Sequence, residues 1–122
     1  MIRTSSPGRR GDHGMVTAEL ALGSLIVAFL AIACAWLIGI VGTYLACADV
    51  AAQVARQRAR GDAPAAAAVT ARAPFGAQVA VVAGAGVVTV TVSVEARPWL
   101  AALPTVPLHA SAVARLEPGV VA

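Results

Sequence analysis

One carboxylate stands at the entrance to a long apolar run. Glu19 lies five residues after Gly14, and no other charged residue occurs between residues 14 and 48. A carboxylate at the edge of hydrocarbon costs a few kcal/mol to insert, so acidic residues of this kind tend to be functional and partnered. The alternative is that Glu19 lies in the first turn of a helix and complements the helix dipole, which is worth up to about 1 kcal/mol.

The other reactive side chains form no catalytic or metal-binding pattern. His13 and His109 are far apart in the sequence, and neither has a Cys, Asp or Glu at a metal-ligand spacing. Cys34 and Cys47 are thirteen residues apart, which is about 20 Å along a helix, so they cannot form a disulfide within one helix. We interpret them as small packing residues and predict that the chain is not an enzyme and carries no cofactor or metal.

The run from Leu20 to Ala48 contains no charged side chain. About 20 apolar residues suffice to cross the ~30 Å hydrocarbon core of a bilayer as a helix. Backbone groups in hydrocarbon must bond to one another, which also favours a helix. We therefore predict a transmembrane helix over residues 15–48. The polar residues 1–13 are expected to be irregular.

Three interpretations of this N-terminal region compete. Ala46-Cys47-Ala48 offers a secretory cleavage site, which would release a small secreted protein, but the apolar run is longer than an ordinary signal peptide. The run also suits an uncleaved anchor of a single-pass accessory protein. The third interpretation is a leader that is removed at its cytoplasmic end, after Gly14. Arginines on both sides of the run leave its orientation undecided by charge.

The third interpretation has a family resemblance behind it. Gly14, the following Met15-Val16-Thr17-Ala18-Glu19 and the apolar helix resemble the class III signal of type IV prepilins and pseudopilins. The motif TAELAL, residues 17–22, is most similar to TadE-like minor pilins of tight-adherence (Flp) pilus systems. The resemblance implies cleavage between Gly14 and Met15 by a prepilin peptidase. It also implies that Glu19 meets the new N-terminal ammonium of a neighbouring subunit and sets the axial register.

The same resemblance implies a cellular setting and partners. Residues 1–14 would be a cytoplasmic leader, residues 15–48 a single transmembrane helix in the inner or plasma membrane, and residues 49–122 a small extracytoplasmic α+β domain. The expected partners are the prepilin peptidase, other pilin or pseudopilin subunits, the Tad-type assembly platform and membrane lipid. The chain would be a non-catalytic component of a pilus or a related secretion system.

A stripe of small residues recurs every four positions in the apolar run, at Ala31, Ala35, Gly39, Thr43 and Cys47. Small side chains allow close approach of helix backbones in membranes, so the stripe predicts a packing face for another helix. Chance in an alanine-rich helix is the alternative. Nucleic acid is not an expected partner, because the net charge is only +3 and the arginines form no single basic face.

Beyond the apolar run, the helix is predicted to continue to about Arg60, with one polar face at Asp49, Gln53, Arg56, Gln57 and Arg60. Gly61 is a predicted helix stop and Asp62 a predicted N-cap, with Pro64 in the next first turn. Residues 63–73 are expected to form a short helix or an ordered linker.

The period then changes to two, which indicates strands. Valine alternates with polar residues in 88–95, residues 78–83 are β-rich, residues 84–86 suit a hairpin loop, and 108–117 alternate again. Residues 99–103 are expected to form one helical turn. The prediction is an α+β, pilin-like fold: a long N-terminal helix and a three-stranded antiparallel sheet with its apolar face on that helix and His109 toward solvent. So thin a core should be stable only with its helix, a membrane or a partner.

Overall fold

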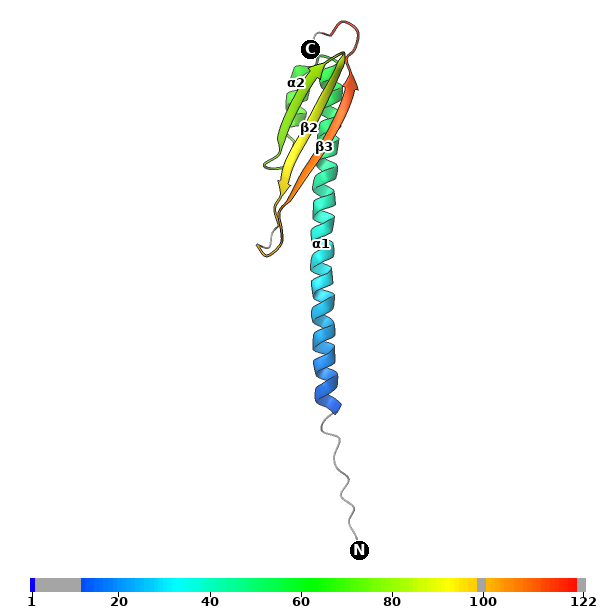
Figure 1. Cartoon of the computed structure of the whole chain (residues 1–122), viewed down its shortest axis with the longest axis vertical. Helices are drawn as coiled ribbons and strands as arrows, with labels where there is room; N and C mark the ends of the chain where they lie inside the picture. Colours follow the sequence, from blue (N-terminus) through cyan, green and yellow to red (C-terminus); the bar gives the residue numbers. More distant parts are fainter. Residues whose placement is uncertain (2–11, 99–100, 121–122) are drawn as a thin grey trace. The chain divides into compact units, whose positions relative to one another are not determined.

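The computed structural model describes Met1, residues 12–98 and residues 101–120. The elements follow in the order α1 (Asp12–Ala59), α2 (Ala63–Thr70), β1 (Gln78–Gly84), β2 (Val87–Ala96) and β3 (Val106–Arg115), as Figure 1 shows. A long apolar N-terminal helix is followed by a small three-stranded antiparallel sheet, which confirms the predicted α+β class. The chain forms two compact units, Met1–Trp36 and Leu37–Ala122.

The first unit is the N-terminal part of α1. Helix begins at Asp12, so the expectation of irregular backbone up to residue 13 was wrong for residues 12 and 13. No proline follows Pro7 in this region, and once a helix is nucleated each further residue adds a hydrogen bond. The single Gly14 costs only about 1 kcal/mol relative to alanine. The remainder of the expected leader, residues 2–11, lies outside the described residues.

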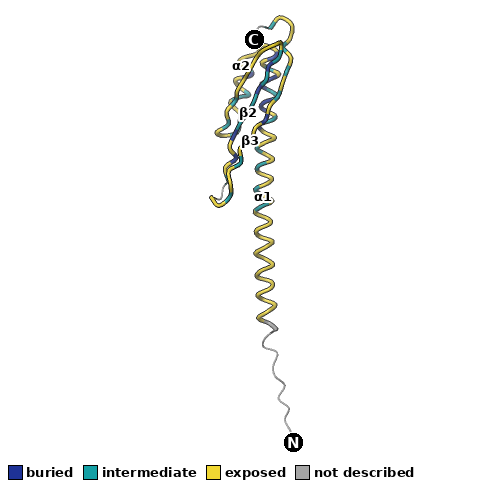
Figure 2. The backbone as a smooth tube through the Cα atoms, viewed as in Figure 1, coloured by how far each residue is buried: buried dark blue, intermediate teal, exposed yellow. Residues whose placement is uncertain are grey.

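The core of the second unit lies between α1 and the sheet. Six residues of α1 are buried at helical spacing: Cys47, Val50, Ala51, Val54, Ala55 and Ala59. The alternating residues of β2 are buried too, together with Leu108 and Ala110 of β3. Figure 2 shows these buried stretches side by side within the unit. Val54 and Val90 are both 0% exposed, as expected for an apolar sheet face that packs on the helix.

The polar face of this part of α1 is also where the sequence placed it. Asp49, Arg56 and Arg60 are exposed, and Gln53 is half-buried and donates a hydrogen bond from Nε2 to Asp49 Oδ2 at 2.6 Å. This i, i+4 pair lies on the surface opposite the buried stripe. The helix is therefore amphipathic where it belongs to the second unit.

The sheet order is β1-β2-β3, with β2 in the centre. Gly84 pairs with Val87, so only Ala85 and Gly86 form the first hairpin loop. Both have positive φ, 52° and 76°, as a type I′ turn requires. Strand β3 begins and ends two residues earlier than predicted, because β2 extends to Ala96 and so offers a partner to Val106. His109 is exposed, as predicted.

The joint between α1 and α2 follows from two residues, Gly61 and Asp62. Gly61, at φ 76°, ends α1: the Asp62 amide donates to the Gln57 carbonyl at 2.9 Å and the Gly61 amide to the Arg58 carbonyl at 3.0 Å. Asp62 caps α2 by accepting a hydrogen bond from the Ala65 amide on Oδ1 at 3.0 Å.

Two short elements differ from their predicted extents. Helix α2 ends at Thr70 instead of 73, because the amides of Arg72 and Ala73 turn back to carbonyls three residues earlier. Of the helical turn expected at residues 99–103, positions 99 and 100 lie outside the described residues, and 101–103 form a turn and a bend.

The end of the sheet is fastened to the end of α1. After β3, the Glu117 amide donates a hydrogen bond to the Ala59 carbonyl at 3.0 Å, and the Glu117 carboxylate lies 3.5 Å from the Arg60 guanidinium. The ion pair is exposed and contributes little by itself. The backbone bond satisfies one of the last carbonyls of α1, which has no partner within the helix.

The valine row of β2 should carry much of the stability of this unit. Val90→Ala removes two fully buried methyl groups and should lower the free energy of unfolding by about 2 kcal/mol. Val82→Ala is the matched control, since Val82 lies on neighbouring β1 but is 67% exposed, and it should cost about 0.5 kcal/mol or less. Chemical denaturation of the full chain in detergent micelles measures both. Equal losses would contradict this core.

Candidate functional site

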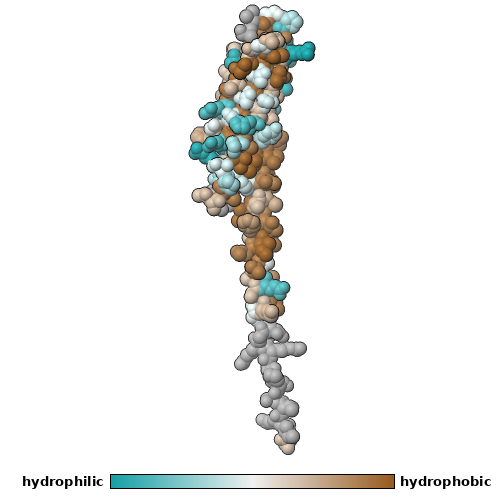
Figure 3. Space-filling view, viewed as in Figure 1, coloured by the Kyte–Doolittle hydropathy of each residue, from teal (hydrophilic) through white to brown (hydrophobic). Residues whose placement is uncertain are grey.

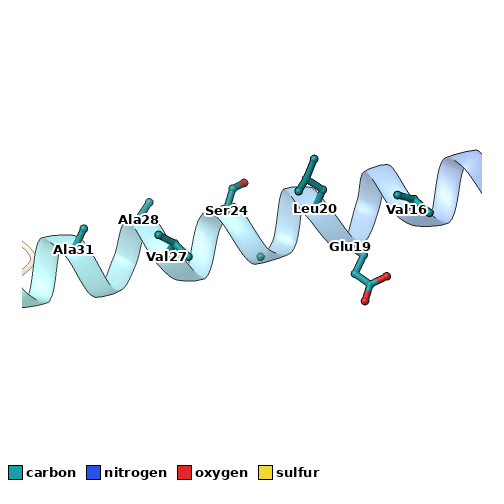
Figure 4. A pocket seen from close by; sticks show the side chains of 8 residues that line it. Val16, Glu19, Leu20, Ser24, Val27, Ala28 and Ala31 are labelled. Atoms are coloured by element: carbon teal, nitrogen blue, oxygen red, sulfur yellow. The ribbon is translucent and has the colours of Figure 1, made fainter.

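The candidate site is a face of α1 in the first unit. Glu19 lies at the edge of an open groove along the helix, which small and apolar residues line: Val16, Leu20, Gly23, Ser24, Val27, Ala28 and Ala31. In Figure 4 the Glu19 carboxylate extends away from the ribbon, and Leu20 and Ser24 project from the other side of the helix in this view. Glu19 and Leu20 are both exposed, so none of the described residues covers this face.

The hydroxyl groups of α1 are satisfied by their own helix. Ser24 donates to the Ala21 carbonyl at 2.9 Å, Thr43 to the Gly39 carbonyl at 2.9 Å and Thr17 to the Gly14 carbonyl at 3.0 Å. Such bonds to the preceding turn are a general property of helical serine and threonine. They remove the need for these hydroxyl groups to find a partner on another chain.

Glu19 differs from these hydroxyl residues. Within the part of the chain that the structure describes, its carboxylate has no hydrogen bond and no ion pair. It is also the only charged side chain among residues 14–48. A carboxylate cannot use the backbone carbonyls of its own helix, because it has no proton to donate when ionised. Its charge therefore requires water, a lipid head group or a cation from another molecule.

The bond proposed for cleavage lies inside α1. Gly14 and Met15 are both exposed and helical, and a Cβ added at Gly14 would meet no atom within 4 Å. The Gly14 carbonyl is the one that accepts the hydroxyl bond from Thr17. This contact was not predicted, although helical threonine commonly bonds to a carbonyl three or four residues earlier.

The stripe of small residues does not have one environment throughout. Ala31, Ala35 and Gly39 are exposed, Thr43 is half-buried, and Cys47 is 0% exposed. Cys47 therefore belongs to the core beneath the sheet, whereas Cys34 is exposed, and both are free cysteines. The stretch available for packing on another helix is the first part of the stripe, from Ala31 to Gly39.

Residues Gly14–Ala59 of α1 are long and apolar enough to cross a membrane, with a mean hydropathy of 2.7 over the most apolar window. An N-terminal signal sequence passes the same test of length and composition. Figure 3 shows hydrophobic side chains along α1, and hydrophilic ones gathered over the sheet. One helix that could span a membrane is thus present, and its apolar side chains, such as Leu25 and Phe29, are 69% exposed.

The other charged and reactive groups that the structure describes form no metal-binding cluster. Among the described residues, no group of three or more His, Cys, Asp or Glu side chains lies close enough to hold a metal ion. Comparison with protein-family models, with curated proteins and with solved structures finds no match to this chain. The candidate site therefore rests on the geometry and chemistry of α1 itself.

Exposed apolar residues of the two units should face different solvents. In a chain with both cysteines replaced by alanine, nitroxide labels are placed at Leu30→Cys on α1 or at Val82→Cys on β1, which are 55% and 67% exposed. In liposomes, the label at position 30 should be relaxed by oxygen and little by a water-soluble nickel chelate, because oxygen concentrates in hydrocarbon. The label at position 82 should show the reverse. Chelate access at position 30 would exclude a spanning helix.

Proposed function

We propose that this chain is a TadE-like pseudopilin or minor pilin, a non-catalytic membrane component of a tight-adherence (Flp) type pilus or a related secretion system. The observation that supports it most is Glu19, the lone charge of the apolar part of α1, which has no hydrogen bond or ion pair with the described residues. The spacing from Gly14 and the exposed groove around Glu19 agree with this proposal.

Assembly would give the Glu19 carboxylate a partner that it lacks among the described residues. Cleavage after Gly14 creates an ammonium group at Met15, and a carboxylate and an ammonium attract strongly where water is scarce. Glu19 lies four positions after Met15, so pairing between neighbouring helices would offset them by about 6 Å along the axis at 1.5 Å per residue. Gly23 lies one helical turn after Glu19 on the same side of α1, and its lack of a side chain allows a second helix to approach there.

The proposed processing is tested by the N-terminal residue and intact mass of the chain recovered from membranes of its native host. A start at Met15, with or without one added methyl group, is expected. A retained Met1 would favour an uncleaved single-pass accessory protein and overturn the proposal. A start at Asp49 in the medium would indicate a secreted protein; this cut would also divide α1 and remove the buried Cys47.

The role of Glu19 in assembly is tested separately. Glu19→Gln keeps the size of the side chain and removes its charge. The variant should still be cleaved, and its recovery with other pilin subunits should fall at least about tenfold, because one ion of a poorly solvated pair is lost. Quantitative mass spectrometry of the detergent-extracted complex measures this ratio.

The matched control is Glu95→Gln, which removes a carboxylate that is exposed on β2 and lies 3.9 Å from Arg97. Its effect should be small, since exposed ion pairs contribute little. An unchanged ratio for Glu19→Gln, at equal membrane levels of both variants, would contradict the assembly role.

A further inference from the structure

The carbonyl oxygen of Gly14, at the proposed cleavage site, accepts two hydrogen bonds from its own helix. Gly14 O accepts the Thr17 hydroxyl at 3.0 Å, and in an α-helix the same oxygen accepts the amide four residues later, that of Ala18. Both lone pairs of this carbonyl oxygen are then engaged. Within the apolar part of α1, Ser24 and Thr43 hold other carbonyls in the same way, but neither lies near the proposed cut.

Hydrolysis of the Gly14–Met15 bond needs this carbonyl to be free. A water oxygen adds to the carbonyl carbon, the carbonyl oxygen takes up a proton from the peptidase, and the C–N bond then breaks as Met15 N leaves with a proton as an amine. The products are the Gly14 carboxylate and the Met15 ammonium. A proton donor of the peptidase must occupy the positions that the Thr17 hydroxyl and the Ala18 amide hold in the helix.

We infer that Thr17 is a positioning residue that keeps the Gly14–Met15 bond in its helical, uncleavable form and so limits the rate of leader removal. This inference rests on the proposed function. The first turn of α1 must open before cleavage, and helix ends are where opening costs least. Gly14 assists opening, because glycine is a poor helix former. The Thr17 hydroxyl opposes it with one extra bond at the carbonyl that has to be released.

The expected size of the effect follows from one hydrogen bond. A typical net hydrogen bond corresponds to about a fivefold change in an equilibrium. If opening precedes cleavage, removing the hydroxyl should raise the rate by about the same factor. Because valine and threonine have similar shapes and similar helix propensities, Thr17→Val removes the bond without otherwise changing the turn.

The experiment follows cleavage of the full chain in detergent micelles by a prepilin peptidase at limiting enzyme, with intact mass as the readout. Thr17→Val should be cut about fivefold faster than the natural chain. Thr17→Ser keeps a hydroxyl and should be cut at the natural rate. Thr43→Val is the matched control, since it removes an equivalent bond, to Gly39, far from the cut, and should leave the rate unchanged.

A second measurement reports on opening itself. Amide hydrogen exchange of Ala18, followed by NMR in the same micelles without peptidase, should accelerate in Thr17→Val and not in Thr17→Ser. Equal exchange and equal cleavage rates in all variants would overturn the inference and leave the proposed function intact. A slower Thr17→Val would overturn it too, since the hydroxyl would then assist the peptidase. Absence of cleavage between residues 14 and 15 in every variant would remove the proposed function and, with it, this inference.

Discussion

The packing of the buried valines of β2 on the buried residues at the end of α1 is the interaction on which the second unit depends. Val90 and Val92 of β2 and Val54 of α1 are all 0% exposed, and the remaining core residues are mostly alanines. Alanine contributes little apolar area, so these few branched side chains provide most of the burial energy. The end of α1 supplies six of the buried core residues, which makes it a structural part of this unit and not only a connection to it.

Strand β1 is less buried than the two other strands. Val79 is half-buried, whereas Val81 is 39% exposed although it faces the same side as Val90. The core therefore covers β2 along its whole length and part of β3, and it leaves β1 exposed apart from Val79. The hairpin keeps β1 in place through its backbone pairing with β2 and through the Ala85-Gly86 turn. Ala85 accepts a positive φ there, which is unfavourable for a residue with a Cβ, because the two-residue loop demands it.

Much of this fold could be predicted because local signals agreed with the packing. The alternation of β2, the stop at Gly61 and the cap at Asp62 each depend on a few adjacent residues. The misplaced boundaries have non-local causes. Strand β3 begins at Val106 because β2 offers a partner at Ala96, and no pattern within 106–117 reveals that. Cys47 has the small size of the other stripe residues, yet its position under the sheet places it in the core. The start of α1 was misplaced because the polar residues before Gly14 carry no hydrophobic periodicity that would mark a helix.

The candidate site was predictable to the extent that it depends on charge. Glu19 stands out in the sequence because an apolar run has a single carboxylate, and the structure adds the distinction between it and the hydroxyl residues. The hydroxyl groups of Thr17, Ser24 and Thr43 donate hydrogen bonds to carbonyls of the preceding turn, so they need no partner outside α1. An ionised carboxylate has no proton to donate and cannot bond to these carbonyls. The partner of Glu19 could not be predicted, because a cation from another molecule leaves no pattern in this sequence. Among the described residues of the apolar part of α1, Glu19 is thus the charge that requires another molecule, and Gly23, one turn further along the helix, leaves space for the group that neutralises it.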